Sequence, residues 1–232
     1  MSTPRLAVFD MDGTLLDSVP DLAACSRELL EICHLPPLTD AEVRTMIGNG
    51  VPTLVQRVLN AGREKQKAIT AQSYVLPFTE AEAVQKFMEL YTPRATQLSR
   101  LFPGTQQALE QLKDAGWLLA VCTNKPAVAA RRILDDFGLT PLFAAIGGGD
   151  SFAAHKPDPA HLLGTIKQAG GEVTRSVMIG DMPPDYGAAT GAGAKFVFAA
   201  WGYGSSALAA QADSQAASMA DIPSALHALL PS

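Results

Sequence analysis

The sequence lacks the features that would place it in a membrane or on nucleic acid. No apolar run among its 232 residues approaches the length of a membrane span. Its 23 acidic residues outnumber its 18 basic ones, and the net charge of -5 has the wrong sign for a general nucleic-acid binder. An apolar run begins almost at the N-terminus and leaves no room for a signal peptide, so we expect a cytoplasmic protein.

Cysteine and histidine are also scarce. The three cysteines are scattered, odd in number and without metal-ligand spacing, as expected of reduced thiols in a cytosol. The four histidines show no paired ligand spacing, so we expect each to be a surface or packing residue. The residues concerned are Cys25, Cys33, Cys122, His34, His155, His161 and His227. Neither a disulfide framework nor a zinc-type site is indicated.

Two carboxylates stand one residue apart near the start of the chain. Asp10 and Asp12 follow the apolar run of residues 6–9, which predicts a buried β-strand ending at residue ten. Ligands of open α/β sheets bind in the crevice outside such strand tips. Strand alternation would send both side chains to the same side, where two like charges need a cation or a shared proton. The pair predicts a site, unless one Asp only caps the segment that begins at Gly13 and Thr14.

A second strand ends in groups suited to phosphate. The apolar run of residues 117–122 stops at Thr123, Asn124 and Lys125, and Pro126 fits the first turn of a helix. Thr123 would stand where a helix N-terminus offers free backbone N–H groups, which can hold phosphate oxygens. Simple N-capping by Thr123 is the alternative.

A lone cation and another carboxylate pair follow further along the chain. Lys156 lies after the glycines of residues 147–149 and just ahead of a predicted helix, where an ordinary surface lysine is the alternative. The predicted strand of residues 176–179 leads to Asp181 and Asp185 at a strand-to-helix turn. Asp185 could also act only as a first-turn acid that complements the helix dipole.

These four stretches, each at the end of a predicted strand, resemble the four motifs of the haloacid dehalogenase superfamily of phosphatases. The motifs correspond to residues 10–14, 123–124, 156–157 and 180–185, and the resemblance covers nearly the whole chain. It implies an α/β fold, with a Rossmann-like parallel-sheet core and an inserted all-helical cap domain.

The resemblance also implies phosphoryl transfer through an aspartyl phosphate. Asp10 would be the nucleophile, and Asp12 the general acid and base. Mg²⁺ would be held by the Asp10 carboxylate, the Asp12 backbone carbonyl and the Asp181 carboxylate. Asp185 would orient the waters around the ion or complete its ligands.

The remaining implied roles concern the phosphoryl group. Thr123, with Asn124 beside it, would hold a phosphoryl oxygen, and Lys156 would pair with Asp10 and the phosphate to supply electrostatic stabilisation. A dehalogenase expels halide and lacks the second Asp, so the presence of Asp12 disfavours dehalogenation.

Between residues 15 and 97 the pattern changes from strands to helices. Apolar residues recur at helical spacing, and capping boxes begin at Thr39 and Thr79. We therefore expect an all-helical cap over residues 15–97, inserted in a discontinuous core of residues 1–14 and 98–232. In the family, such a cap closes over the site and contacts the leaving group.

The cap sequence resembles that of bacterial phosphoglycolate phosphatases over residues 47–57. The resemblance implies that 2-phosphoglycolate is the substrate and that glycolate and phosphate are the products. The carboxylate of 2-phosphoglycolate would need a cation or N–H donors in the cap. The candidates are Arg44, Arg57, Gly48 and Asn49. Ordinary turn chemistry is the alternative explanation for the glycines.

Other functions stay open at this stage. The chain could hydrolyse a sugar or amino-sugar phosphate, or return the phosphoryl group to its substrate like a β-phosphoglucomutase. A phosphonatase is disfavoured because we find no convincing lysine in an apolar pocket before Arg63. A non-catalytic regulatory module is disfavoured because Asp10, Asp12, Lys156 and Asp181 are all present. We expect a small phosphate ester as partner, no nucleic acid, no membrane, and a monomer or homodimer.

The region after the last motif carries no predicted catalytic residue. We expect a strand over residues 195–200 and a turn at residues 201–204 near the sheet edge. The stretch of residues 205–218 is rich in Ala, Ser and Gln and is compatible with a helix, so it predicts a surface segment.

Overall fold

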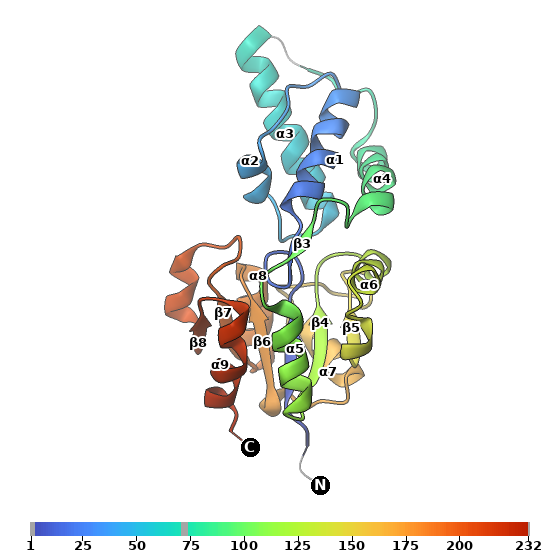
Figure 1. Ribbon diagram of the computed structural model, residues 1–232. Helices are drawn as coiled ribbons and strands as arrows, with labels where there is room; N and C mark the ends of the chain where they lie inside the picture. The colour runs from blue at the N-terminus through green and yellow to red at the C-terminus, as the bar shows by residue number, and fades with distance from the viewer. Residues whose placement is uncertain (1–2, 71–73, 232) are drawn as a thin grey trace. The chain divides into compact units, whose positions relative to one another are not determined.

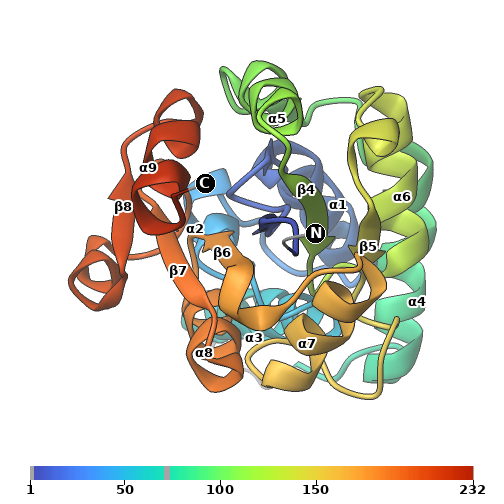
Figure 2. The ribbon, with the colours of Figure 1, turned by 90° about the horizontal axis from the view of Figure 1, so that it is seen from below.

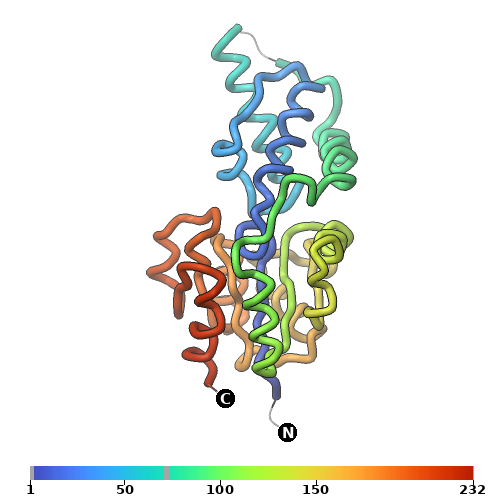
Figure 3. The backbone as a smooth tube through the Cα atoms, in the orientation of Figure 1, coloured from blue at the N-terminus to red at the C-terminus, as the bar shows by residue number. Residues whose placement is uncertain are grey.

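The computed structural model describes residues 3–70 and 74–231, and the chain forms two compact units (Figures 1 and 3). Unit 1 contains Met1–Asp17 and Leu101–Ser232, and unit 2 contains Ser18–Arg100. The first segment of unit 1 thus ends at residue 17 rather than 14, and the second begins at residue 101 rather than 98. The reason is that Leu15 and Leu16 are buried and the Leu15 carbonyl accepts a hydrogen bond from the N–H of Phe102.

Unit 1 is built on a six-stranded parallel sheet in the order β5-β4-β1-β6-β7-β8. The strands are β1 (Leu6–Phe9), β4 (Leu118–Cys122), β5 (Ala145–Gly147), β6 (Ser176–Gly180), β7 (Lys195–Ala199) and β8 (Ser214–Ala216). β1 lies inside the sheet, where Phe9 is level with Val121 of β4 and Ile179 of β6. The residues that follow these three strands therefore emerge side by side at one edge.

Helices cover both faces of this sheet, with α7 and α8 on one face and α5 and α9 on the other (Figure 2). The helices are α5 (Thr105–Asp114), α6 (Ala127–Asp136), α7 (Pro159–Gln168), α8 (Pro183–Ala192) and α9 (Ile222–Leu229). Short 3₁₀ turns are η2 (Thr140–Leu142), η3 (Val173–Arg175), η4 (Ser206–Gln211) and η5 (Met219–Asp221). Burial on both faces explains why the strand sequences are continuously apolar rather than alternating. All four residues of β1 are fully buried.

Unit 2 is helical, as expected. It contains α1 (Val19–Ile32), α2 (Asp40–Arg44), α3 (Val51–Thr70), α4 (Glu80–Tyr91) and the turn η1 (Thr92–Arg94). The capping boxes at Thr39 and Thr79 are both formed, each with the Glu three residues later. A two-stranded sheet of β2 (Leu16–Asp17) and β3 (Arg100–Leu101) lies where the chain passes between the units.

A buried carboxylate joins the two ends of unit 2. Asp21, in the first turn of α1, is 1% exposed. It accepts hydrogen bonds from the backbone N–H of Leu98 and from both the backbone N–H and the hydroxyl of Ser99. The helix that enters unit 2 is therefore bound to the segment that leaves it.

Two structural findings bear on the remaining expectations. No helix among residues 3–70 and 74–231 is long and apolar enough to cross a membrane. The stretch of residues 205–218, expected as a surface segment compatible with a helix, is mostly exposed and contains η4 and the edge strand β8. Ala216 of β8 is buried and pairs with Ala199 of β7, so tertiary pairing overrides the local helix preference.

Candidate active site

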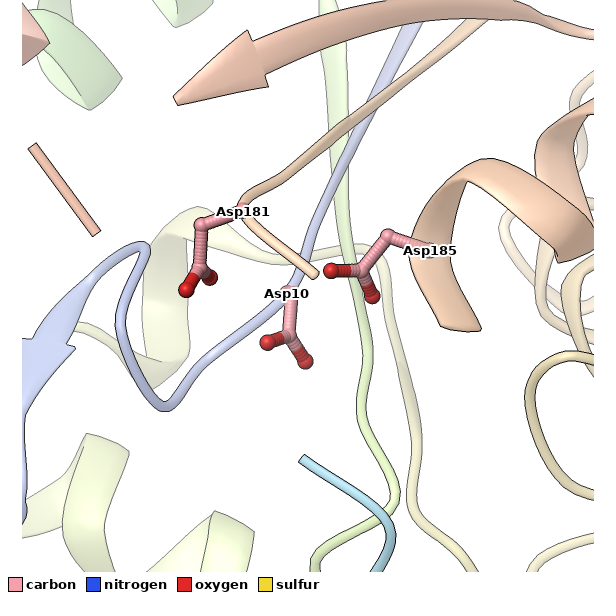
Figure 4. Close-up of side chains that lie close together, drawn as sticks. All are labelled: Asp10, Asp181 and Asp185. Atoms are coloured by element: carbon pink, nitrogen blue, oxygen red, sulfur yellow. The ribbon is translucent and has the colours of Figure 1, made fainter. Parts of the chain in front are cut away.

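Three carboxylates from separate parts of unit 1 point toward one another (Figure 4). Asp10 follows β1, Asp181 follows β6, and Asp185 lies in the first turn of α8. One oxygen of each lies within 4.8 Å of the others, and all three residues are buried. The parallel sheet produces this convergence because the carboxyl ends of its strands share one edge.

Lys156 supplies positive charge to this cluster. Its Nζ donates hydrogen bonds to Asp10 Oδ1 at 2.7 Å, to Asp185 Oδ1 at 2.6 Å and to the Cys122 carbonyl at 2.6 Å. The residue is 2% exposed. Its ammonium is therefore buried and is held between the carboxylates of Asp10 and Asp185.

One lysine does not balance three buried carboxylates. Burial raises the pKa of Asp10 to about 7, against the opposing effect of Lys156, and Asp185 adds to the rise. Burial, with the charges of Asp185 and Asp10, raises the pKa of Asp181 well above its ordinary value. Burial alone would lower the pKa of Lys156, but the charges of Asp10 and Asp185 hold it above its ordinary value. The donor set is all oxygen with excess negative charge, which suits a small hard cation.

Asp12 has a cationic partner that the sequence analysis left without a role. The Nζ of Lys125 lies 3.3 Å from Asp12 Oδ2, and Lys125 is 5% exposed. Lys125 comes directly after Thr123 and Asn124, so its position at a strand end was the signal available in the sequence.

The residues predicted to bind phosphate also connect the loops of the site. Thr123 is buried, and its hydroxyl accepts a hydrogen bond from the N–H of Lys125 at 3.2 Å. The Asn124 side-chain amide donates to the Lys156 carbonyl at 2.9 Å. The loop after β4 is thereby fixed to the loop that carries Lys156.

Asp181 sits in a tightly built cradle. Its Oδ1 accepts a hydrogen bond from the Thr14 hydroxyl at 2.8 Å, and its Oδ2 accepts one from the N–H of Tyr203 at 2.7 Å. Gly13 has φ of 94°, and a Cβ there would lie 2.4 Å from Asp181 Oδ2. A Cβ at Gly204 would lie 1.7 Å from the Asp181 carbonyl oxygen. Only glycine allows the chain to approach so closely at these two positions.

The turn at residues 201–204 is therefore part of the site, which the sequence analysis did not foresee. Besides the Tyr203 N–H, it contributes the Trp201 indole, which donates to the Thr14 carbonyl at 3.0 Å. The Tyr203 hydroxyl donates to Asp17 Oδ1 at 2.9 Å. The turn's small and aromatic composition was visible in the sequence, but a main-chain donor leaves no residue-specific signal.

The four candidate specificity residues all lie in unit 2. Arg57, on α3, donates hydrogen bonds to the Met46 carbonyl at 2.9 Å and to Asn49 Oδ1 at 3.0 Å. Gly48, with φ of 113°, lies between these two acceptors in the same loop. Arg44 is exposed at the end of α2. The structure thus brings Arg57, Gly48 and Asn49 together in one cluster.

Comparison with known proteins agrees with this arrangement. A family profile described as haloacid dehalogenase-like hydrolase matches residues 7–199. The phosphoglycolate phosphatase of Cereibacter sphaeroides (strain ATCC 17029) is 41% identical over 196 residues, covering 84% of this chain and 85% of that protein. The phosphoglycolate phosphatase of Mesorhizobium japonicum is 38% identical over 204 residues, covering 88% and 85%.

A solved structure is similar over almost the full length. The crystal structure of a predicted phosphoglycolate phosphatase from Haemophilus somnus 129PT matches with a TM-score of 0.87 and 32% identity, covering 97% of this chain and 98% of that one. The strand-end carboxylates, the buried lysine and these relatives agree. The chain belongs to the haloacid dehalogenase-like hydrolases, a family of enzymes.

Proposed function

We propose that this enzyme hydrolyses phosphate monoesters, and that 2-phosphoglycolate is its substrate, giving glycolate and phosphate. The observation that carries the reaction type is the position of Asp10, whose carboxylate is held by Lys156 at 2.7 Å beside Asp181 and Asp185. Support for the substrate comes from relatives at about 40% identity that bear the name phosphoglycolate phosphatase.

The buried carboxylates fit a divalent cation, and Mg²⁺ is the ion we propose. Asp10, Asp181 and the backbone carbonyl of Asp12 would hold it, with Asp185 completing its surroundings. The structural reason is that one oxygen of each of three buried carboxylates lies within 4.8 Å of the others. Burial, and then the charges of the neighbouring carboxylates, raise the pKa values of Asp10 and Asp181. When bound, the ion neutralises charge on both the nucleophile and the phosphate.

The chain's own residues then divide the chemistry. An oxygen of Asp10 attacks phosphorus, and the bond between phosphorus and the leaving alcohol breaks as Asp12 donates a proton to that alcohol. Asp12, now ionised, takes a proton from the water that attacks phosphorus of the aspartyl phosphate. The bond between phosphorus and the Asp10 oxygen breaks, which releases phosphate and restores the carboxylate. Lys156 and the N–H groups after Thr123 stabilise charge on the phosphoryl oxygens.

The residues that we propose to bind the substrate's carboxylate belong to unit 2. Arg57 and Asn49 are hydrogen-bonded to each other, and Gly48 gives the loop a backbone that ordinary residues rarely adopt. Such a loop can present N–H donors and a guanidinium edge to a small anion. Arg44, at the end of α2, is the second arginine that we propose for this role.

A panel of phosphate esters assayed with Mg²⁺ tests the proposal. We expect kcat/KM for 2-phosphoglycolate to exceed that for hexose phosphates by at least about 10-fold, the factor that corresponds to about 1.4 kcal/mol of discrimination. A preference for a hexose phosphate would assign a sugar phosphatase instead. Recovery of an isomeric sugar phosphate, without release of inorganic phosphate, would assign a mutase.

A further inference from the structure

His161 is a buried histidine with both ring nitrogens engaged. It lies in the first turns of α7 and is fully buried. Its Nδ1 lies 3.2 Å from the backbone nitrogen of Lys156, and its Nε2 lies 3.3 Å from the Gly147 carbonyl oxygen. The sequence analysis treated it only as a packing or surface residue.

The partners of the ring determine its tautomer. A backbone N–H can only donate, so Nδ1 must offer a lone pair to Lys156. A carbonyl can only accept, so Nε2 must carry the proton and donate it to Gly147. The imidazole is therefore neutral with its hydrogen on Nε2. Burial, followed by the charge of Lys156, lowers the pKa of His161 to about 4, which keeps this form at neutral pH.

The two contacts fix a loop that has no regular structure of its own. Residues 148–158 form neither helix nor strand, so no sheet or helix hydrogen bond places Lys156. The Gly147 carbonyl, at the end of β5, also accepts the N–H of Thr123 at 2.9 Å. On the other side of the same lysine, its carbonyl accepts the Asn124 amide. The Lys156 backbone is thus held at both its N–H and its carbonyl.

We propose that His161 is a positioning residue, which fixes the backbone of Lys156 against the end of β5 so that the ammonium meets Asp10. The inference rests on the proposed function, because Lys156 is taken to act on the phosphoryl group. A lysine has four rotatable side-chain bonds, so its tip is placed accurately only if its backbone does not move. Electrostatic stabilisation depends on charges held in place before the reaction.

The two hydrogen bonds can be separated by substitution. Asparagine places an amide oxygen near the position of Nδ1, so His161→Asn keeps an acceptor for the Lys156 N–H. Glutamine places an amide nitrogen near the position of Nε2, so His161→Gln keeps only the donor to Gly147. His161→Leu removes both. Leu162→Ala is the matched control. Leu162 is fully buried on the same helix, but its side chain cannot hydrogen-bond to the Lys156 backbone.

We expect kcat on 2-phosphoglycolate and on p-nitrophenyl phosphate to fall about 10- to 100-fold in His161→Gln and His161→Leu, the usual range for a residue that orients a functional group. His161→Asn should stay within about 5-fold of the wild type, and KM should change little in any variant. Leu162→Ala should lose stability yet keep its kcat at a temperature where it is folded. Equal kcat in His161→Asn and His161→Gln would overturn the inference, and this comparison does not require His161→Leu to fold.

A second measurement separates this inference from the proposed function. Hydrogen exchange of the Lys156 amide, followed by NMR, should be slow in the wild type and His161→Asn and at least about 10-fold faster in His161→Gln, because only the first two retain an acceptor. A wild type that hydrolyses neither ester would refute the proposed function, and the exchange rates would still decide what His161 does. Unchanged exchange in His161→Gln would refute the positioning role even if the enzyme is an active phosphatase.

Discussion

The ammonium of Lys125 lies 3.3 Å from Oδ2 of Asp12, and the two groups belong to strand-end loops that the whole of unit 2 separates in the sequence. Asp12 is the proposed general acid and base, so the lysine sets the electrostatic surroundings of the group that must give up and regain a proton. Asp10 has a lysine of its own, Lys156. Each of the two proposed catalytic carboxylates is thus paired with a separate buried cation.

Replacing Asp10 by Asn should abolish turnover and leave the fold intact. The amide is nearly isosteric but cannot form the acyl phosphate, and Lys156 keeps its contacts to Asp185 and the Cys122 carbonyl. Steady-state kinetics and circular dichroism of the purified variant check both statements. More than a small residual rate in a pure preparation would remove Asp10 as the nucleophile.

Asp12→Asn should lose about 10²- to 10⁴-fold in kcat, the usual contribution of general acid and base catalysis. Its Mg²⁺ affinity, measured by calorimetry, should remain close to that of the wild type, because the proposed ligand is the backbone carbonyl. A chelator should abolish the phosphatase activity of the wild type, and added Mg²⁺ should restore that activity. The assignment is reversed if the variant loses metal binding while its chemistry is unchanged.

Gly204→Ala should weaken Mg²⁺ binding by about 10- to 100-fold, the range found when groups that orient metal ligands are disturbed. A Cβ at this position would overlap the backbone carbonyl oxygen of Asp181, so the Asp181 backbone must shift. The Asp181 carboxylate, a proposed Mg²⁺ ligand, would then move with it. Titration calorimetry with Mg²⁺ measures the effect directly. Ser206→Ala, an exposed change two residues away, is the control and should bind Mg²⁺ like the wild type.

Acidification should destabilise the wild type partly through His161. The pKa of His161 is lowered to about 4 in the folded protein from 6.5, so the unfolded state binds more protons between these values. The free energy of unfolding therefore falls as the pH drops from 6.5 through 4, by about 3 kcal/mol at about 1.4 kcal/mol per pH unit. Urea unfolding at several pH values should show a flatter pH dependence in His161→Asn. Leu162→Ala, which removes no titratable group, should retain the wild-type slope.

The loop around Gly48 provides the test of substrate recognition. A buried carboxylate without a partner costs several kcal/mol, so losing its cation should penalise 2-phosphoglycolate more than a neutral ester of similar size. We expect Arg44→Ala or Arg57→Ala to lose about 1.5–3 kcal/mol selectively on 2-phosphoglycolate, the range for a charge-assisted hydrogen bond. Arg63→Ala, on the same helix as Arg57, is the same-charge control. Equal losses on both esters would show that neither arginine reads the carboxylate.

The parts of the site that the sequence predicted are those carried by side chains at strand ends. Asp10, Thr123 and Asp181 each follow a short apolar run, and a parallel sheet brings such positions to one edge. Lys156 differs, because it was predicted from its place just ahead of a helix. The apolar runs and the capping boxes likewise predicted the sheet and the helical insertion. These signals are local, so they can be read without knowing the fold.

The parts that the sequence did not predict depend on distant contacts. Tyr203 acts on Asp181 through its backbone N–H, which every residue except proline possesses. His161 likewise contacts Lys156 at a backbone atom. The ion pair of Lys125 with Asp12 could not be predicted, because the two residues are far apart in the sequence. Strand β8 forms because β7 offers an edge, against the helix preference of its own sequence. Each requires the folded neighbour to be known.

The carboxylate of Asp21 makes unit 2 a module with joined ends. Because the first turn of α1 is hydrogen-bonded to Leu98 and Ser99, the segment that enters and the segment that leaves are held together within the module itself. Domains whose ends are close tolerate insertion into, and removal from, a host chain. A hydrolase core of this kind can therefore exchange one such insertion for another, and so change its substrate, without altering the strands that carry its catalytic groups.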